Sequence, residues 1–215
     1  KGAWQQAPFF KVKTMDKTTI CNQALGLIAN GEVLDIAGNE PRAKKCRLYY
    51  DAVVYTALAF YDWSFARKRK QPALSAEKFD GYKYAYVIPE DSLHISRYLD
   101  ENGQPLELSG NSTVVLSSNN ASRLILTNRK ITNIIYTFKQ MNTEMWSPGF
   151  AEAVTFLLAS KICETIPNLK NEANNKFQQY QGLIAVAKND DVREEMKFYD
   201  KNPFKNYRGY DGSIF

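Results

Sequence analysis

The sequence predicts an α+β fold: a four-helix bundle, with two helices before and two after, that carries an inserted antiparallel β-module. Three patterns predict it. Apolar residues recur at helical spacing along residues 39–66. Aromatic residues take every second position from residue 82 to residue 86, within the strand expected at 82–88. Apolar residues then cover nearly all sides of the stretch that follows Ser147 and Pro148, which is typical of a central helix.

The first two helices have clear start signals. We expect the first over residues 17–30, because Asp16 can accept a hydrogen bond from a free N–H of the first turn and Gly31 can adopt the left-handed conformation that ends a helix. The second, long helix is expected over residues 39–66, with Asn39 as its cap and Pro41 in its first turn. Its apolar stripe consists of Ala43, Cys46, Tyr50, Val53, Ala57, Tyr61 and Phe65.

The long helix is expected to end at a basic run, Arg67-Lys68-Arg69-Lys70, followed by Pro72. Cations stabilise the negative end of the helix dipole, and proline cannot continue a helix. The run has two other interpretations: salt bridges in an interface, or contact with DNA phosphates, which requires only positive charge. Aromatic residues do not interleave it, so a platform for single-stranded nucleic acid is not indicated.

Between the helices, short strand-like runs alternate with turn residues such as Asn102-Gly103. Because helices flank this module on both sides, its two ends must lie close together for those helices to pack. The expected strands are residues 82–88, 93–99, 105–108, 114–117, 123–127 and 132–139.

Two more helices follow the β-module. Ser147 and Pro148 start the third helix, Pro167 ends it, and Asn168 starts the fourth. The stripe of the fourth helix consists of Ala173, Phe177, Tyr180, Ile184 and Ala187. The predicted domain limits are an N-terminal arm at 1–16, the helical bundle at 17–72 and 147–199, the β-module at 78–140 and an extended tail at 200–215.

Composition narrows the class of protein. The 215 residues carry a net charge of +5, which is too small to indicate a nucleic-acid binder by itself. Cys21, Cys46 and Cys163 lie in apolar helical patterns without CxxC spacing, which indicates reduced, buried thiols.

No apolar run reaches the roughly 18 residues of a membrane span, and no signal peptide opens the numbered chain. We therefore expect no membrane association. Since residue 1 is Lys, either the start was processed away or Met15 is a natural start behind an upstream arm.

The sequence contains little catalytic material. It has no glycine-rich phosphate loop, nucleophile elbow or HExxH pattern, so we expect no catalytic residue, cofactor or metal. His94 is the only histidine and has no neighbouring acid or paired Cys, which favours a structural or surface role. A pair of carboxylates would be needed for glycoside hydrolysis, whereas an acidic run on a late helix is usually a solvated face. The candidates for such a pair are Glu144, Glu152, Glu164, Asp190, Asp191, Glu194 and Glu195.

Several short motifs follow one another in a specific order. They are ICNQAL at 20–25, Ala43 with Cys46 and Tyr50-Asp51, DWSFA at 62–66, GYKYAYVIPEDSL at 81–93, PGFAEA at 148–153 and LLA at 157–159. In order and spacing, over about residues 15–195, the chain resembles the tail tubular protein A family of short-tailed bacteriophages. The arm before Met15 and the aromatic tail after Asp200 depart from the family pattern.

The resemblance implies a head-to-tail adaptor with no enzymatic activity. In this family a dodecameric ring lies below the portal, carries the tail nozzle and surrounds the DNA exit channel. The implied partners are copies of the chain itself, the portal protein, the nozzle protein and genomic DNA that passes without sequence-specific contact. The implied location is the neck of the virion, after synthesis in the bacterial host cytoplasm. The family fold, a helical bundle with an inserted β-domain, agrees with the fold predicted from periodicity.

Aromatic residues near both ends of the chain are the candidate partner-interface residues, because large amphipathic rings and Arg carry much of the energy of interfaces. The alternative function is a tail-associated glycan hydrolase that uses a carboxylate pair, and a third is a stand-alone binding module. The interface candidates are Phe204, Tyr207, Arg208, Tyr210 and Phe215 in the tail, and Trp4, Phe9 and Phe10 in the arm.

Overall fold

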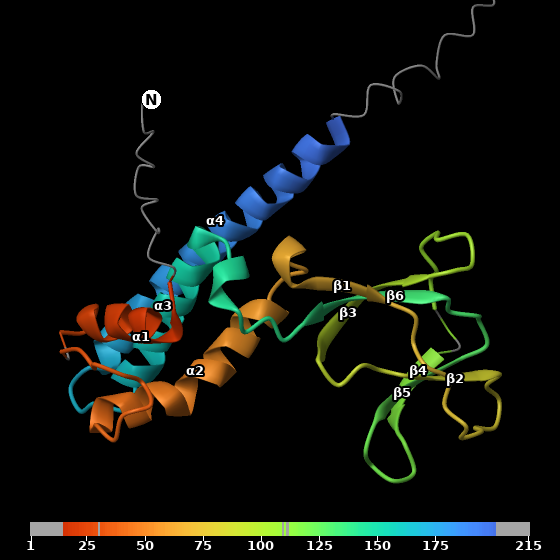
Figure 1. Ribbon diagram of the computed structural model, residues 1–215, viewed down its shortest axis with the longest axis horizontal. Helices are drawn as coiled ribbons and strands as arrows, with labels where there is room; N and C mark the ends of the chain where they lie inside the picture. Colours follow the sequence, from red (N-terminus) through yellow and green to blue (C-terminus); the bar gives the residue numbers. More distant parts are fainter. Residues whose placement is uncertain (1–14, 30, 109, 111, 201–215) are drawn as a thin grey trace, which may run out of the picture. The chain divides into compact units, whose positions relative to one another are not determined.

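The computed structural model describes residues 15–29, 31–108, 110 and 112–200, and it confirms the predicted fold class (Figure 1). The chain is α+β, with four helices, two before and two after a pair of three-stranded antiparallel sheets. The helices are α1 (Lys17–Gly26), α2 (Pro41–Ala59), α3 (Pro148–Cys163) and α4 (Lys170–Asp200). The strands are β1 (Arg67–Lys70), β2 (Tyr84–Val87), β3 (Ser92–Leu99), β4 (Ser112–Leu116), β5 (Arg123–Thr127) and β6 (Asn133–Phe138).

The chain divides into two compact units. The first takes in the chain up to Val53 together with Met141–Gln181, and the second takes in Val54–Gln140 together with the chain from Gly182 onward. Helices α2 and α4 therefore each contribute residues to both units. The domain limits predicted from the sequence stay a prediction.

In the first unit, α1 begins where the sequence indicates and ends early. The Oδ1 atom of Asp16 accepts a hydrogen bond from the backbone N–H of Thr19 at 2.7 Å, as expected of an N-cap. The helix stops at Gly26 rather than at residue 30, and Ala29 adopts a left-handed conformation with φ of 52°. The loop that follows is held by the Asn22 side chain, which bonds both the N–H and the carbonyl of Val33 at 2.9 Å.

Helix α3 is buried on nearly all sides, as predicted, and packs against α1. The Oγ atom of Ser147 accepts from the N–H of Phe150, and Pro148 occupies the first turn. Near the other end, the buried Ser160 hydroxyl donates to the carbonyl of Ala173 at 2.9 Å and so joins α3 to the first turn of α4.

The stripe predicted for α4 is confirmed except at one position. Phe177 is 41% exposed, so its assignment to the buried stripe is wrong. The side chain that reaches α3 at this level is that of Lys176, whose Nζ atom lies 5.9 Å from the centre of the Phe156 ring. The buried members of the stripe are Ala173, Tyr180, Ile184 and Ala187.

The long helix does not reach residue 66, which corrects the prediction. Helix α2 ends at Ala59, and the fully buried Trp63 turns back so that its Nε1–H donates to the carbonyl of Ala57 at 3.0 Å. A short 3₁₀ turn (Ser64–Ala66) follows, and Tyr61 and Phe65 lie outside the helix. The basic run is therefore not a helix end, because Arg67–Lys70 forms strand β1.

The two ends of the β-module lie side by side, as expected. The first sheet has the order β1-β6-β3, in which β1 pairs antiparallel with β6 from Arg67↔Thr137 to Lys70↔Ile134. The chain thus enters and leaves the module on neighbouring strands. Strand β3 pairs with the other side of β6 and carries two register shifts.

The second sheet has the order β2-β5-β4 and shares a core with the first. The residues predicted as a strand at 105–108 form only an isolated bridge, between Pro105 and Leu99, which corrects that prediction. The opposite face of the second sheet packs against Phe79 and Tyr82. The shared core consists of Tyr86, Ile88, Ile125, Ile131, Ile134 and Tyr136.

The structure also shows where the three cysteines and the histidine lie. All three cysteines are free and buried, as expected. Cys21 and Cys46 share a hydrogen bond that, together with burial, raises the pKa of the Cys21 thiol. His94 is exposed on β3. Among the described residues, no helix is long and apolar enough to cross a membrane, and no group of His, Cys, Asp and Glu side chains is arranged to hold a metal ion.

The end of α2 yields a stability prediction. Replacing Trp63 with Phe removes the indole N–H, leaves the Ala57 carbonyl without that donor and opens a small cavity. We expect a loss of about 2 to 4 kcal/mol in the free energy of unfolding, measured by urea denaturation. The matched control is Phe60→Ala, because Phe60 is 51% exposed, and we expect it to change stability by less than about 0.5 kcal/mol. Equal effects of the two changes would contradict this account of the helix end.

Candidate functional site

The residues predicted to form the partner interface cannot be placed. Phe204, Tyr207, Arg208, Tyr210 and Phe215 in the tail, and Trp4, Phe9 and Phe10 in the arm, all lie outside the described residues. Their role as interface residues stays a prediction.

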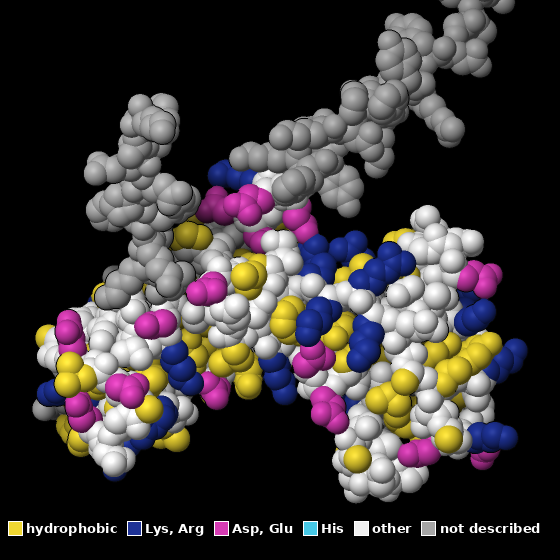
Figure 2. Space-filling model, in the orientation of Figure 1, with side chains coloured by type: hydrophobic (Ala, Val, Ile, Leu, Met, Phe, Trp, Pro, Cys, Tyr) yellow, Lys and Arg dark blue, Asp and Glu magenta, His cyan; other side chains and the backbone are white. Residues whose placement is uncertain are grey.

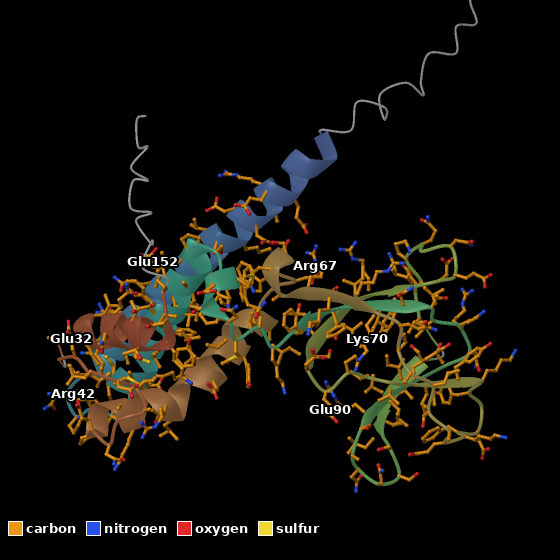
Figure 3. All side chains as sticks on the ribbon, viewed as in Figure 1. Glu32, Arg42, Arg67, Lys70, Glu90 and Glu152 are labelled. Carbon is orange, nitrogen blue, oxygen red and sulfur yellow. The ribbon has the colours of Figure 1, made fainter. Side chains whose placement is uncertain are left out.

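Several of the carboxylates considered for catalysis already have partners. Glu164 pairs with Lys161 at 2.9 Å, and Asp190 pairs with Arg193 at 3.6 Å. Glu144 and Glu194 are exposed. Glu152, which is labelled in Figure 3, lines an apolar groove between α1 and α3, together with residues that include Leu27 and Phe156. The last two candidates, Asp191 and Glu195, belong to a polar cluster that includes Arg67, the first residue of β1.

We call this group the Arg67 cluster: Asp62, Ser64, Arg67, Asp191 and Glu195, all in the second unit. The Arg67 side chain is 21% exposed and lies among carboxylates. Its Nε atom lies 3.1 Å from Oδ2 of Asp62, its Nη2 donates to the Asp62 carbonyl at 2.7 Å, and its Nη1 donates to the Glu195 carboxylate. The cluster therefore joins the turn after α2 and the first residue of β1 to the second half of α4.

Asp191 holds the other side of this junction. Its carboxylate is buried, with the residue only 4% exposed, and it accepts hydrogen bonds from Ser64. The donors are the Ser64 hydroxyl at 2.6 Å and the Ser64 backbone N–H at 3.1 Å. Ser64 is the first residue of the 3₁₀ turn, so Asp191 satisfies an N–H that no earlier carbonyl of that turn can bind.

The carboxylates of the Arg67 cluster stabilise the charged form of Arg67. Burial by itself would lower the pKa of Arg67, but the hydrogen bond to Glu195 and the charge of Asp62 outweigh it and raise that pKa. Burial, followed by the negative charges of Asp191 and Glu195, raises the pKa of Tyr61. These carboxylates are occupied by structural partners, so the cluster is suited to fixing the junction rather than to proton transfer.

The rest of the basic run lies on the surface. The Nζ atom of Lys68 contacts Oδ2 of Asp91 at 2.8 Å and lies 3.7 Å from the centre of the Phe138 ring. Arg69 and Lys70 are exposed. Figure 3 labels Arg67 and Lys70, the two ends of β1, and Figure 2 shows Lys and Arg side chains gathered in this part of the molecule. Arg67 and Lys68 thus form ion pairs within their own unit, and both the interface and the DNA-phosphate interpretations of the run stay untested.

Asp91 also bonds the buried Tyr136 on β6. The Tyr136 hydroxyl donates to Oδ1 of Asp91 at 3.1 Å. Burial opposes ionisation of Asp91, but the hydrogen bonds from Lys68 and Tyr136 outweigh it and lower its pKa. Burial and the nearby Asp91 charge raise the pKa of Tyr136 to about 12. The Asp91 carboxylate therefore links β1 to β6, and its role is structural.

Several large apolar side chains are exposed among the described residues. In the second unit Leu74 is 63% exposed at the rim of a cleft of about 530 Å³ that Tyr84 also lines. Val114 and Leu116, both on β4, are 55% and 58% exposed. Isolated exposed apolar residues are normal in a monomer, but two on the same face of one edge strand are a candidate contact surface.

Comparison of the chain with models of known protein families and with curated protein sequences finds no match. Sequence reasoning missed the Arg67 cluster, because Ser64 and Asp191 are 127 residues apart and no local pattern connects them. It also missed β4 as a surface, because Ser-Thr-Val-Val-Leu is equally consistent with a buried strand.

The Arg67 cluster yields a second stability prediction. Arg67→Met approximates the length of the side chain, removes the cation from Glu195 and leaves Asp62 with Arg97 at 4.0 Å. Because the arginine is one-fifth exposed, we discount the cost of a fully buried pair and expect a loss of about 1 to 3 kcal/mol in urea denaturation at pH 7.

The matched control is Arg69→Met on the same strand, whose side chain is exposed. We expect it to change the free energy of unfolding by less than about 0.5 kcal/mol. If both substitutions gave the same small change, the Arg67 cluster would not hold the junction.

Proposed function

We propose that this chain is a structural subunit of a phage head-to-tail connector ring that joins the portal to the tail nozzle around the DNA exit channel. The observation that carries the proposal is the order of elements: two helices, an inserted β-module and two more helices. This is the arrangement that the resemblance to the tail tubular protein A family implies. The proposed partners are other copies of the chain, a portal protein and a nozzle protein, with the assembled protein in the virion.

The motif residues on which the resemblance is based lie in the core, and this supports the resemblance at the level of the fold. Cys21, Cys46, Tyr50, Trp63 and Tyr86 belong to the quoted motifs, and each is at most 3% exposed. Core residues set the fold, so their order is informative about the fold and only by analogy about the function. The proposed function depends on whether the surface offers binding contacts or catalytic groups.

The surface supports a role in contact rather than in turnover. Large apolar side chains are exposed in both units, among them Leu34 at 96% and Leu48 at 70%. Within the described residues, two of the carboxylates considered for catalysis, Asp191 and Glu195, are held by structural partners. The hydrolase alternative, which needs a pair of available carboxylates, therefore has less support.

The proposed mechanism is mechanical. Each subunit contributes surfaces that bind neighbouring copies, the portal and the nozzle, and DNA passes without sequence-specific contact. Fixed phosphate contacts resist sliding, so a channel wall should avoid a continuous stripe of free cations. Two of the four cations of β1, Arg67 and Lys68, are paired with acids of their own unit, which reduces the free charge of the basic run.

Removal of the tail tests the proposed contact with the portal. A chain ending at Asp200 keeps every described residue, so we expect its circular dichroism spectrum and unfolding midpoint to match those of the full chain. We expect it to fail to form a complex with the portal protein in sedimentation velocity experiments, because the aromatic anchors are absent.

A full-length control carries Asn202→Ala and Asn206→Ala, which spare the tail aromatics and Arg208. We expect this control to assemble normally. Normal assembly by the truncated chain would refute the docking role of the tail.

A further inference from the structure

Each of the two sheets has one edge that is covered by an adjoining segment. Beyond β3, the N–H of Leu106 donates to the carbonyl of Tyr98 at 2.8 Å. Beyond β2, the N–H of Val87 donates to the carbonyl of Ala73, and the N–H of Ser75 donates to the carbonyl of Ala85, both at 2.8 Å. The outer edges of β1 and β4 end their sheets. Within the described residues, no backbone group of another segment is bonded to the outer edge of β4.

These two free edges have opposite character. Strand β1 reads Arg-Lys-Arg-Lys, and a row of cations on an edge strand is a common protection against pairing with another strand. Strand β4 reads Ser-Thr-Val-Val-Leu and carries no charge. The fold therefore protects one edge and leaves the other open to a partner strand.

The open edge is also the uncovered rim of a core. Val114 pairs with Ile125, which is 1% exposed and belongs to the core shared by the two sheets. Paired residues lie on the same face, so Val114 and Leu116 continue the face of that core onto β4. Both are more than half exposed there, and Figure 2 shows hydrophobic side chains at the surface around this sheet. A strand added beside β4 would bond its backbone and cover this rim.

We propose that the edge of β4 binds the segment Phe10–Thr14 of a second copy of this chain. The occupant must present apolar side chains at alternate positions and contain no proline in the paired stretch. Phe-Lys-Val-Lys-Thr meets both conditions, with Phe10, Val12 and Thr14 on one side and two lysines on the other. The other stretch outside the described residues, 201–215, is interrupted by Pro203, Gly209 and Gly212 and contains no such alternation.

The docked segment extends the β2-β5-β4 sheet by one strand. Val12 lies beside Val114 and Phe10 beside Leu116, so both cover the rim, while Lys11 and Lys13 lie on the opposite face. Main-chain hydrogen bonds supply the affinity, and the alternation fixes the register, because a slip of one residue would place lysines on the apolar face. The segment ends directly before Met15, the first described residue, and so lies close in sequence to α1.

This inference rests on the proposed ring and deepens it. A contact between one surface and a different surface of the next copy is heterologous, and such contacts form a ring where the rotation between neighbours closes. The segment of each copy would bind β4 of the next copy, so a closed ring would leave no β4 edge bare.

Disulfide cross-linking in the full chain tests this contact. Val12→Cys and Val114→Cys are made in separate chains, which are mixed, assembled and oxidised gently. Paired residues on adjacent strands lie within the range of Cα separations that a disulfide requires. The native cysteines Cys21, Cys46 and Cys163 are fully buried and do not compete. We expect a covalent dimer that joins positions 12 and 114, identified by mass spectrometry of the linked peptides.

The matched control replaces Val12→Cys with Lys11→Cys, whose side chain would point to the opposite face. We expect its cross-linking to Val114→Cys to be at least tenfold lower. In the double variant with both Val12→Cys and Val114→Cys in one chain, we expect ladders of linked chains. A link only within single chains would overturn the proposal.

The two proposals fail in distinguishable ways. If the mixed chains assemble but give no link between positions 12 and 114, the β4 contact is overturned and the ring stands. If the chains never assemble, even with the portal protein present, the ring is overturned. A peptide of residues 7–14 added to the full chain then decides whether β4 accepts this strand. Binding that shifts the amide resonances of residues 112–116 and is lost with Val12→Pro supports the site; no shift overturns it.

Discussion

The pairing of β1 with β6 is the constraint on which the rest of the structure depends. An inserted module can leave the packing of its host helices intact only if the chain enters and leaves it at nearly the same place. Here the entry strand and the exit strand are direct neighbours over four residue pairs. The hydrogen bonds of this ladder close the module, and Asp91 bonds Lys68 on β1 and Tyr136 on β6.

The Arg67 cluster transmits this constraint to the helical part of the second unit. Arg67 is the first residue of β1, and its guanidinium is held by Asp62 before the strand and by Glu195 on α4. Asp191, one turn earlier on α4, holds the N–H and hydroxyl of Ser64. Partly buried charges of this kind are stable only as a complete set, because removing one leaves the others without compensation. The cluster therefore fixes the direction in which the chain leaves α2.

The sequence predicts the parts of this fold that depend on short-range chemistry. Asp16 and Ser147 cap their helices because an N-cap bond joins residues three apart, and the aromatic alternation around Tyr84 and Tyr86 is a local pattern. It fails where a distant partner decides. Arg67–Lys70 looks like a helix end until β6, almost seventy residues later, supplies the strand that pairs with it.

The prediction that Tyr61 and Phe65 are helical is wrong for the same reason: a tertiary contact overrides the local pattern. The apolar period through Tyr61 and Phe65 is real, but burial of the Trp63 indole against the Ala57 carbonyl ends the helix first. The candidate site is harder still to predict. Neither the contact of Ser64 with Asp191 nor the open edge of β4 has a local signal, since the first joins residues 127 apart and the second is defined by which strands lie beside it.

An account based on contact surfaces predicts association and needs no chemical step. The direct measurement is the mass of the purified full chain, alone and with the portal protein, by native mass spectrometry. The account predicts a closed complex that contains twelve copies of the 24.6 kDa chain when the portal is present. A chain that stays a monomer at every concentration and with the portal, yet cleaves glycan substrates, would contradict it.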